Sequence, residues 1–198
     1  MTNQRYAKTT RQSAETKILV EANLDGSGCY NLQTGIGFFD HMLSHLAKQS
    51  FIDLTIEAKG DTHIDSHHTI EDTGIVLGSC LAEALGTKDG IKRYGFSGVP
   101  MDETLVYCSI DLSGRAFLKF DAPFTTDRLG DMETEMVEEF FRALSSHLKM
   151  NCHIEVRYGK NNHHIAEGIF KAFGKALDEA KTIDPRIQGA HSTKGLFD

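Results

Sequence analysis

Residues 67–84 (HHTIEDTGIVLGSCLAEA) and residues 163–180 (HHIAEGIFKAFGKALDEA) are two versions of one segment. When they are aligned at an offset of 96 residues, seven of the 18 positions are identical, including both histidines and the glutamate of a His-His-x-x-Glu motif. Both segments carry apolar residues at the spacing of an amphipathic helix. An internal repeat of this kind predicts a tandem duplication.

The repeat extends outward from these two segments. The strand patterns before them end at Gly60 and Gly159, 99 residues apart, and the helix patterns at about 38–49 and 133–148 align at an offset of 98. The turn residues 25–28 predict that the first two strand patterns form a hairpin. The predicted strands are 16–21, 29–33, 52–58, 96–101, 104–111, 115–121 and 152–158, with one more near residues 5–10.

Both halves therefore have the element order β-β-β-α-β-α. We expect an α+β fold built by tandem duplication of this unit, in which each half is an antiparallel sheet with helices on one face. The helical faces of the two halves should pack together. Residues 1–90 form the first half and residues 91–198 the second, and we expect both to form one domain.

The composition excludes several classes of protein. The chain has 198 residues, 40% of them hydrophobic, and a formal net charge of −7, which argues against a nucleic-acid partner. No apolar stretch approaches the ~20 residues that cross a bilayer, and the polar start lacks the apolar region of a signal peptide. We expect a cytoplasmic protein with no membrane partner. The four cysteines form no C-x-x-C pair and are expected to be buried, reduced thiols.

The His-His-x-x-Glu motif predicts metal ligands. On a helix, His67 and His68 lie four and three residues before Glu71, so either histidine can share an ion with the glutamate. The two adjacent histidines point about 100° apart, so they should serve different ions. The motif recurs at His163, His164 and Glu167, which makes two ions a consistent interpretation.

The repeat adds one candidate ligand per half, because His41 aligns with Glu139. Four protein ligands per ion would leave open coordination positions, and imidazole with carboxylate but without thiolate suits Mn, Fe, Co or Zn, of which we favour Mn. A single H-x-x-E would more often be a solvated helix face, and the doubled pattern argues against this. His45, His147 and His191 show no partner at ligand spacing and are expected at the surface or an interface. The candidate metal ligands are His41, His67, His68, Glu71, Glu139, His163, His164 and Glu167.

Five segments, taken together, resemble the imidazoleglycerol-phosphate dehydratase family, a lyase family of histidine biosynthesis. They are TGIGFFDHML (34–43), GDTHIDSHHTIED (60–72), DLSGR (111–115), KNNHHIAEGIFKA (160–172) and STKG (192–195). The resemblance implies dehydration of D-erythro-imidazoleglycerol phosphate, a small phosphorylated imidazole, to imidazole acetol phosphate. It also implies two Mn²⁺ ions per active site and a homo-oligomer of 24 subunits whose sites form between subunits.

The resemblance also sorts the ligands. It assigns His41, His68, Glu71 and His164 to one ion, and His67, Glu139, His163 and Glu167 to the other. Many relatives have histidine where this chain has Glu139, and a carboxylate can replace imidazole on a hard divalent ion. Gln49-Ser50 stands where the family usually has His-Gly, and Gln49 remains a candidate substrate contact.

The remaining candidate residues follow from the resemblance as well. Two ions on the ring nitrogens would favour the imidazolate, whose electrons can expel hydroxide from the adjacent carbon. Glu15 would contact the substrate and move the C2 proton, and with the His and Glu ligands other than Glu139 it completes the candidate catalytic set. Taken alone, Glu15 would be interpreted as a surface carboxylate. The candidate phosphate-binding residues are Arg93, Arg115, Lys171, Ser192, Thr193 and Lys194.

Two other functions stay open at this point. A non-catalytic, His-rich metal-binding or storage shell would use the same ligands, but it gives the phosphate-binding cations no role. A di-iron carboxylate oxidase uses E-x-x-H ligands from a four-helix bundle, whereas this chain has H-x-x-E and too many strands. Turnover of imidazoleglycerol phosphate separates the lyase from both.

Overall fold

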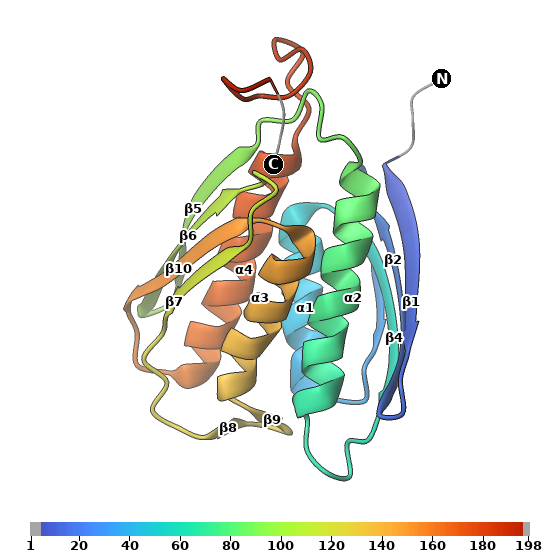
Figure 1. The fold of residues 1–198 in the computed structure, drawn as a ribbon. Helices are drawn as coiled ribbons and strands as arrows, with labels where there is room; N and C mark the ends of the chain where they lie inside the picture. Colours follow the sequence, from blue (N-terminus) through green and yellow to red (C-terminus); the bar gives the residue numbers. More distant parts are fainter. Residues whose placement is uncertain (1–4, 196–198) are drawn as a thin grey trace.

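Alternating burial along the strands and apolar stripes on the helices divide the protein into three layers. The computed structural model describes residues 5–195, in which two four-stranded sheets enclose four helices (Figure 1). The first half consists of β1 (Tyr6–Gln12), β2 (Thr16–Asn23), β3 (Tyr30–Gln33), α1 (Gly37–Ser50), β4 (Asp53–Gly60) and α2 (His67–Leu85). The second half consists of β5 (Tyr94–Met101), β6 (Thr104–Asp111), β7 (Phe117–Asp121), β8 (Arg128–Leu129), β9 (Met132–Glu133), α3 (Glu135–Leu148), β10 (Asn151–Tyr158) and α4 (Asn162–Lys181).

The two sheets have the same topology, which confirms the duplicated α+β fold. Their strand orders are β1-β2-β4-β3 and β5-β6-β10-β7. The predicted hairpin of residues 16–21 and 29–33 is wrong, because β4 lies between β2 and β3 and pairs with both. The side chain of Asp53, at the start of β4, accepts hydrogen bonds from the N–H groups of Ser27 and Cys29 and so holds the turn against β4.

The expectation that each sheet is antiparallel is also wrong, because each sheet contains one parallel pair of strands. β3 runs parallel to β4, and β7 runs parallel to β10, while the other pairs in the two sheets are antiparallel. In each half a helix, α1 or α3, lies between the parallel strands in the sequence, as a parallel connection requires.

The core lies between the sheets, where the helices pack in two pairs, α1 with α4 and α2 with α3. Five phenylalanines fill the centre of this bundle, and none of them is exposed to solvent; they are Phe39, Phe140, Phe141, Phe170 and Phe173. Burial of one such side chain contributes about 1.5–3 kcal/mol. The predicted packing of the two helical faces is therefore confirmed.

Two glycines of the repeat allow the paired helices to approach closely. A Cβ on Gly78 of α2 would lie 2.8 Å from the carbonyl oxygen of Leu144 in α3, and a Cβ on Gly174 of α4 would lie 2.9 Å from that of Leu46 in α1. Gly78 and Gly174 are equivalent in the repeat, and so are Leu46 and Leu144. The same helix contact is therefore made twice, once across each pair.

A small hairpin that the sequence did not predict joins the second half to the first. β8 and β9 enclose Asp131, whose carboxylate accepts hydrogen bonds from the N–H groups of Gly37 (2.7 Å) and Phe38 (3.1 Å). Partial burial opposes ionisation of Asp131, but these hydrogen bonds outweigh it and lower the pKa of the carboxyl. Asp131 thus caps α1, the helix that carries His41, because the N-cap residue Ile36 has no side-chain oxygen to do so.

Two expectations about the chain's environment can be compared with the structure. Within residues 5–195, every helix is too short or too polar to cross a membrane. Cys80, Cys108 and Cys152 are buried free thiols as expected, whereas Cys29 is exposed, because it lies in the turn between β2 and β3.

We predict that Gly174→Ala lowers the free energy of unfolding by about 1–3 kcal/mol, because the added methyl group forces α4 away from α1. The loss should occur even though alanine favours a helix by up to ~1 kcal/mol over glycine. Urea denaturation followed by circular dichroism measures it. Lys175→Ala, at an exposed position of the same helix, is the matched control and should change stability little. A Gly174→Ala protein as stable as the wild type would show that the contact is not close in solution.

Candidate metal and substrate site

The N-terminal ends of the four helices lie at one end of the molecule (Figure 1). There α1 and α4 bring four donor side chains together. The Nε2 atoms of His41 and His163 lie 3.5 and 3.2 Å from Oε2 of Glu167, and Nε2 of His45 lies 3.5 Å from its Oε1. We call His41, His45, His163 and Glu167 the α1–α4 cluster.

Glu167 is the buried centre of this cluster, with 8% of its side chain exposed. Nζ of Lys171, one turn further along α4, lies 2.5 Å from Oε1. Burial would raise the pKa of Glu167, but the hydrogen bond from Lys171, the neighbouring His45 and the charge of Lys171 outweigh it and lower the pKa to about 2. The carboxylate is therefore ionised and oriented, with Oε2 toward His41 and His163.

His45 contradicts the expectation that it has no partner at ligand spacing. It follows His41 by four residues on α1, so both rings lie on one helix face, and their Nε2 atoms are 3.4 Å apart. Burial is the main cause that lowers the pKa of His45 and favours its neutral form. The i, i+4 spacing was visible in the sequence.

The equivalent residues of α2 and α3 are His67, Glu71 and Glu139, and their carboxylates are more exposed than that of Glu167. Nε2 of His67 lies 3.8 Å from Oε2 of Glu71, and 45% of the Glu71 side chain is exposed. Glu139 occupies on α3 the place that His41 has on α1, and the side chain of Arg142 lies 3.4 Å from its carboxylate. We call His67, Glu71 and Glu139 the α2–α3 cluster.

The other two histidines of the motif are each held by a carboxylate. Nδ1 of His68 lies 3.0 Å from Asp61, and Nδ1 of His164 lies 2.7 Å from Glu103. These hydrogen bonds are the main cause that raises the pKa of each histidine. The pKa of Glu103 is lowered by the N–H of Asn161, by His164 and by the N–H of Lys160. A carboxylate on Nδ1 fixes the ring and leaves Nε2 as the donor atom for a metal.

Glu15 lies beside His68. Its Oε1 is 3.9 Å from Nε2 of His68, and the β1–β2 turn that carries it is tied to α2 by Asp72. The buried carboxylate of Asp72 accepts hydrogen bonds from Arg11, at 3.0 Å, and from the hydroxyl of Thr16. The turn therefore places a carboxylate within reach of a candidate ligand.

Most candidate phosphate-binding residues lie at the other end of the molecule. Arg93, Ser192 and Thr193 line a cavity of about 570 Å³ near the C-terminal end of α4. Arg93 is held there by Asp111, at 2.6 Å, and its own N–H donates to the carbonyl of Ala180. Ala180 follows Glu167 by 13 residues, or about 20 Å along the helix. Within one chain, these residues are therefore about 20 Å away from the α1–α4 cluster.

The remaining predicted residues divide between the two ends. Lys194 adjoins the cavity, since its N–H donates to the hydroxyl of Ser192. Arg115 lies toward the same end as Arg93, because it is three residues after Leu112, whose N–H donates to the carbonyl of Arg93. Lys171 instead pairs with Glu167 in the α1–α4 cluster. Gln49 lies two turns after His41, where its Cβ packs against Gly174.

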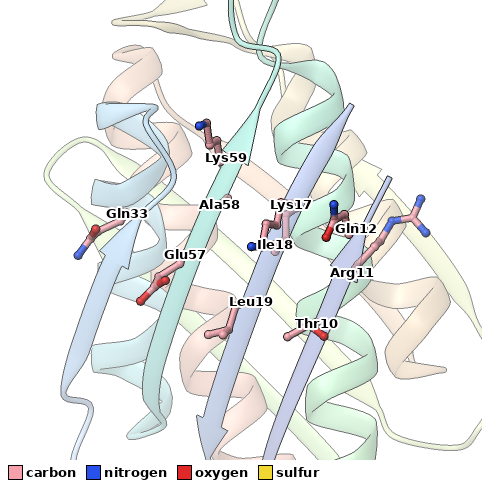
Figure 2. A pocket seen from close by; sticks show the side chains of 10 residues that line it. All are labelled: Thr10, Arg11, Gln12, Lys17, Ile18, Leu19, Gln33, Glu57, Ala58 and Lys59. Carbon is pink, nitrogen blue, oxygen red and sulfur yellow. The ribbon is translucent and has the colours of Figure 1, made fainter. Parts of the chain in front are cut away.

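Another open cavity, of about 540 Å³, lies on the outer face of the first sheet (Figure 2). Figure 2 shows that its lining residues come from β1, β2, β3 and β4; among them, Ile18 belongs to the buried core and Arg11 bonds Asp72 of α2. It contains none of the candidate ligands or phosphate-binding residues. We do not assign it to the site.

The residues at the helix N-termini fit a divalent metal ion. Neighbouring ligands held ~2.1 Å from one ion lie about 3 Å apart, close to the 3.2 Å between Nε2 of His163 and Oε2 of Glu167 and to the 3.4 Å between the Nε2 atoms of His41 and His45. Within residues 5–195, His41, His45 and Glu167 are the one group of three His, Cys, Asp or Glu residues whose donor atoms all lie within 4.8 Å of one another. The donors are imidazole and carboxylate, as expected for a site without thiolate.

Sequence reasoning missed the carboxylates that hold the ligands. Asp61 precedes α2, whereas Glu103 comes from the β5–β6 turn, so the two serve equivalent histidines from different elements. The repeat therefore gave no signal for them. His45 could have been found from its spacing to His41.

Comparison with known proteins identifies close similarities along the whole chain. A family model described as imidazoleglycerol-phosphate dehydratase matches residues 34–177. The chain is 59% identical over 194 residues to the imidazoleglycerol-phosphate dehydratase of Lachnoclostridium phytofermentans, an alignment that covers 98% of this chain and 99% of the relative. It is 57% identical over 195 residues to that of Clostridium acetobutylicum, with coverage of 98% and 99%.

Two solved structures have the same fold. The crystal structure of imidazoleglycerol-phosphate dehydratase from Staphylococcus aureus matches with a TM-score of 0.82 at 38% identity, covering 90% of this chain and 99% of that chain. The Pyrococcus furiosus structure, solved in complex with (S)-C348, matches with a TM-score of 0.79 at 33% identity, covering 95% and 99%.

We predict that Glu103→Gln weakens Mn²⁺ binding by about 10- to 100-fold, because the amide keeps an acceptor for the backbone N–H groups but holds the His164 ring less firmly. Calorimetric titration of chelator-treated protein with Mn²⁺ measures the change. Glu155→Gln is the matched control, since Glu155 is exposed on β10 and pairs with Arg157. Equal Mn²⁺ affinity in Glu103→Gln and wild type would contradict the assignment.

Proposed function

The chain belongs to the imidazoleglycerol-phosphate dehydratase family, metal-dependent hydro-lyases of histidine biosynthesis that act on a phosphorylated substrate, and we propose that two Mn²⁺ ions per active site are bound by its eight predicted ligands. The duplicated cluster at the helix N-termini supports this proposal most directly. The non-catalytic storage shell is not favoured, because the family and its relatives are dehydratases.

The separation of the clusters supports a site shared between subunits. In the proposed sorting, one ion takes His41 and His164 from the α1–α4 side and His68 and Glu71 from α2. The other takes His163 and Glu167 from α4, with His67 and Glu139 from the α2–α3 side. Among residues 5–195, no group of three donors within 4.8 Å combines the two sides. We propose that the α1–α4 side of one subunit meets the α2–α3 side of a neighbour, so that each site is shared between subunits.

The position of the phosphate-binding residues also supports a site that is shared between subunits. The substrate carries its phosphate on a three-carbon tail, which is too short to reach from the α1–α4 cluster to Arg93, about 20 Å along α4. The phosphate would therefore be held by Arg93, Ser192 and Thr193 of another subunit. A homo-oligomer of 24 subunits in the cytoplasm is the assembly that we propose.

The bound ions would supply positive charge at both ring nitrogens and so favour loss of a ring proton. Asp61 and Glu103 would hold His68 and His164 in the orientation that presents Nε2. Lys171 would hold Glu167 and extend toward the substrate tail. Glu15 would transfer the C2 proton, and its distance of 3.9 Å from His68, a proposed ligand, supports this role.

The direct test is turnover of imidazoleglycerol phosphate to imidazole acetol phosphate by metal-replete protein. We predict that Glu15→Gln lowers kcat by on the order of 10²-fold or more, because the amide cannot carry the proton. Metal content and assembly size should be unchanged. Lys194→Ala is the comparison variant, and it should raise KM more than it lowers kcat because it removes a phosphate contact. A near-normal kcat in Glu15→Gln would exclude Glu15 from proton transfer.

We further predict that two inactive variants complement each other. Glu71→Ala removes a ligand from the α2–α3 cluster and Glu167→Ala removes one from the α1–α4 cluster. If each site combines both clusters from different subunits, a one-to-one mixed oligomer should regain about a quarter of the wild-type activity, because a quarter of its sites are intact. Co-expression with two affinity tags yields the mixed oligomer. Activity no greater than that of the separate variants would place each site within one chain.

A further inference from the structure

His45 is placed like a metal ligand, although neither the repeat nor the family resemblance assigns it a role. It lies one turn after His41 on the face of α1 that meets α4. Its Nε2 lies 3.4 Å from Nε2 of His41 and 3.5 Å from Oε1 of Glu167. The side chain is 20% exposed, so a neighbour or an ion can still reach its ring.

The spacing matches that of two histidines that bind one ion from a helix. Imidazoles at i and i+4 on one helix face can ligate the same metal, as in helical H-x-x-x-H motifs. Two ligand nitrogens on one ion at ~2.1 Å are about 3 Å apart, so small side-chain rotations suffice to close the observed 3.4 Å. Glu167 holds His45 in place, because its Oε1 faces Lys171 and His45 while its Oε2 faces His41 and His163.

The additional donor His45 occurs in only one half of the duplication. At the offset of 98 residues His45 aligns with Ala143 of α3, which has no donor atom. At the offset of 96 residues Lys171 aligns with Ile75 of α2. The α1–α4 cluster therefore offers four donors where the equivalent residues of the α2–α3 cluster offer three.

We propose that His45 is a further ligand of the ion that His41 binds, so that the two ions of the site are held unequally. The inference rests on the proposed two-metal dehydratase site for its ions, and on the geometry of α1 for its residue. The ion bound by His41 and His45 should be the tighter of the two. The effect of losing His45 should fall on that ion alone.

The test is Mn²⁺ binding to chelator-treated His45→Gln and His45→Ala, by calorimetry and by electron spin-echo spectroscopy of the bound ion with ¹⁵N-histidine labelling. We expect one of two binding events to weaken by about 10-fold or more and the other to be unchanged. The histidine-nitrogen signal of the tighter ion should fall by one nitrogen, which a residue that only positions Glu167 would not cause. Gel filtration and circular dichroism of His45→Gln show whether the protein is folded.

His147→Gln is the matched control. His147 is half-buried on α3 and bonds the carbonyl of Ala143, and the equivalent residue of the other half is already a glutamine, Gln49. It should bind both ions like the wild type. Wild-type affinities or an unchanged nitrogen signal in His45→Ala would overturn the proposal. Wild-type protein that binds two ions but fails to turn over imidazoleglycerol phosphate would refute the proposed function instead, while the His45 measurement would stand.

Discussion

The candidate site depends on the close packing of paired helices. Gly174 allows the backbone of α4 to approach the carbonyl of Leu46 in α1, and both helices begin at the same end of the molecule (Figure 1). His41 lies five residues before Leu46 and Glu167 seven before Gly174, or about 7.5 and 10.5 Å along nearly parallel axes. The two side chains therefore meet, with Nε2 of His41 3.5 Å from Oε2 of Glu167. A shift of α1 by one turn, ~5.4 Å, would separate them.

Duplication repeats this packing but not its chemistry. Gly78 and Leu144 make the same contact between α2 and α3, and His67 and Glu71 again face one another from successive turns. Yet 45% of the Glu71 side chain is exposed, against 8% for Glu167, which is paired with Lys171. One scaffold thus carries a carboxylate that is oriented by its own chain and another that is open to a neighbour. Because a preorganised ligand loses less entropy on binding, the two clusters should contribute unequally to metal affinity.

The sequence predicted local structure well and long-range pairing poorly. The helices and the candidate ligands followed from a 3.6-residue period and an internal repeat, which are local signals. The insertion of β4 between β2 and β3 did not follow, because the turn residues 25–28 are compatible with either pairing and Asp53, which settles it, lies 25 residues beyond the turn. Asp61 and Glu103 were missed because the elements that supply them are not equivalent in the repeat. The sequence also did not predict that Arg93 and Lys171 lie far apart, because both match residues of the family's phosphate-binding cluster.

The distribution of these groups along the molecule constrains the proposed assembly. Because the four helices are parallel in direction (Figure 1), all their N-termini and both donor clusters lie at one end, while Arg93 and Ser192 lie near the C-terminal end of α4. A substrate that needs both kinds of group must be bound where one end of a subunit meets the other end of its neighbour. Such a contact is heterologous, and heterologous contacts either grow without limit or close into rings. A closed shell of many subunits, as proposed here, satisfies that requirement, whereas an isolated two-fold dimer joined through identical ends would leave the metal and phosphate groups of every site apart.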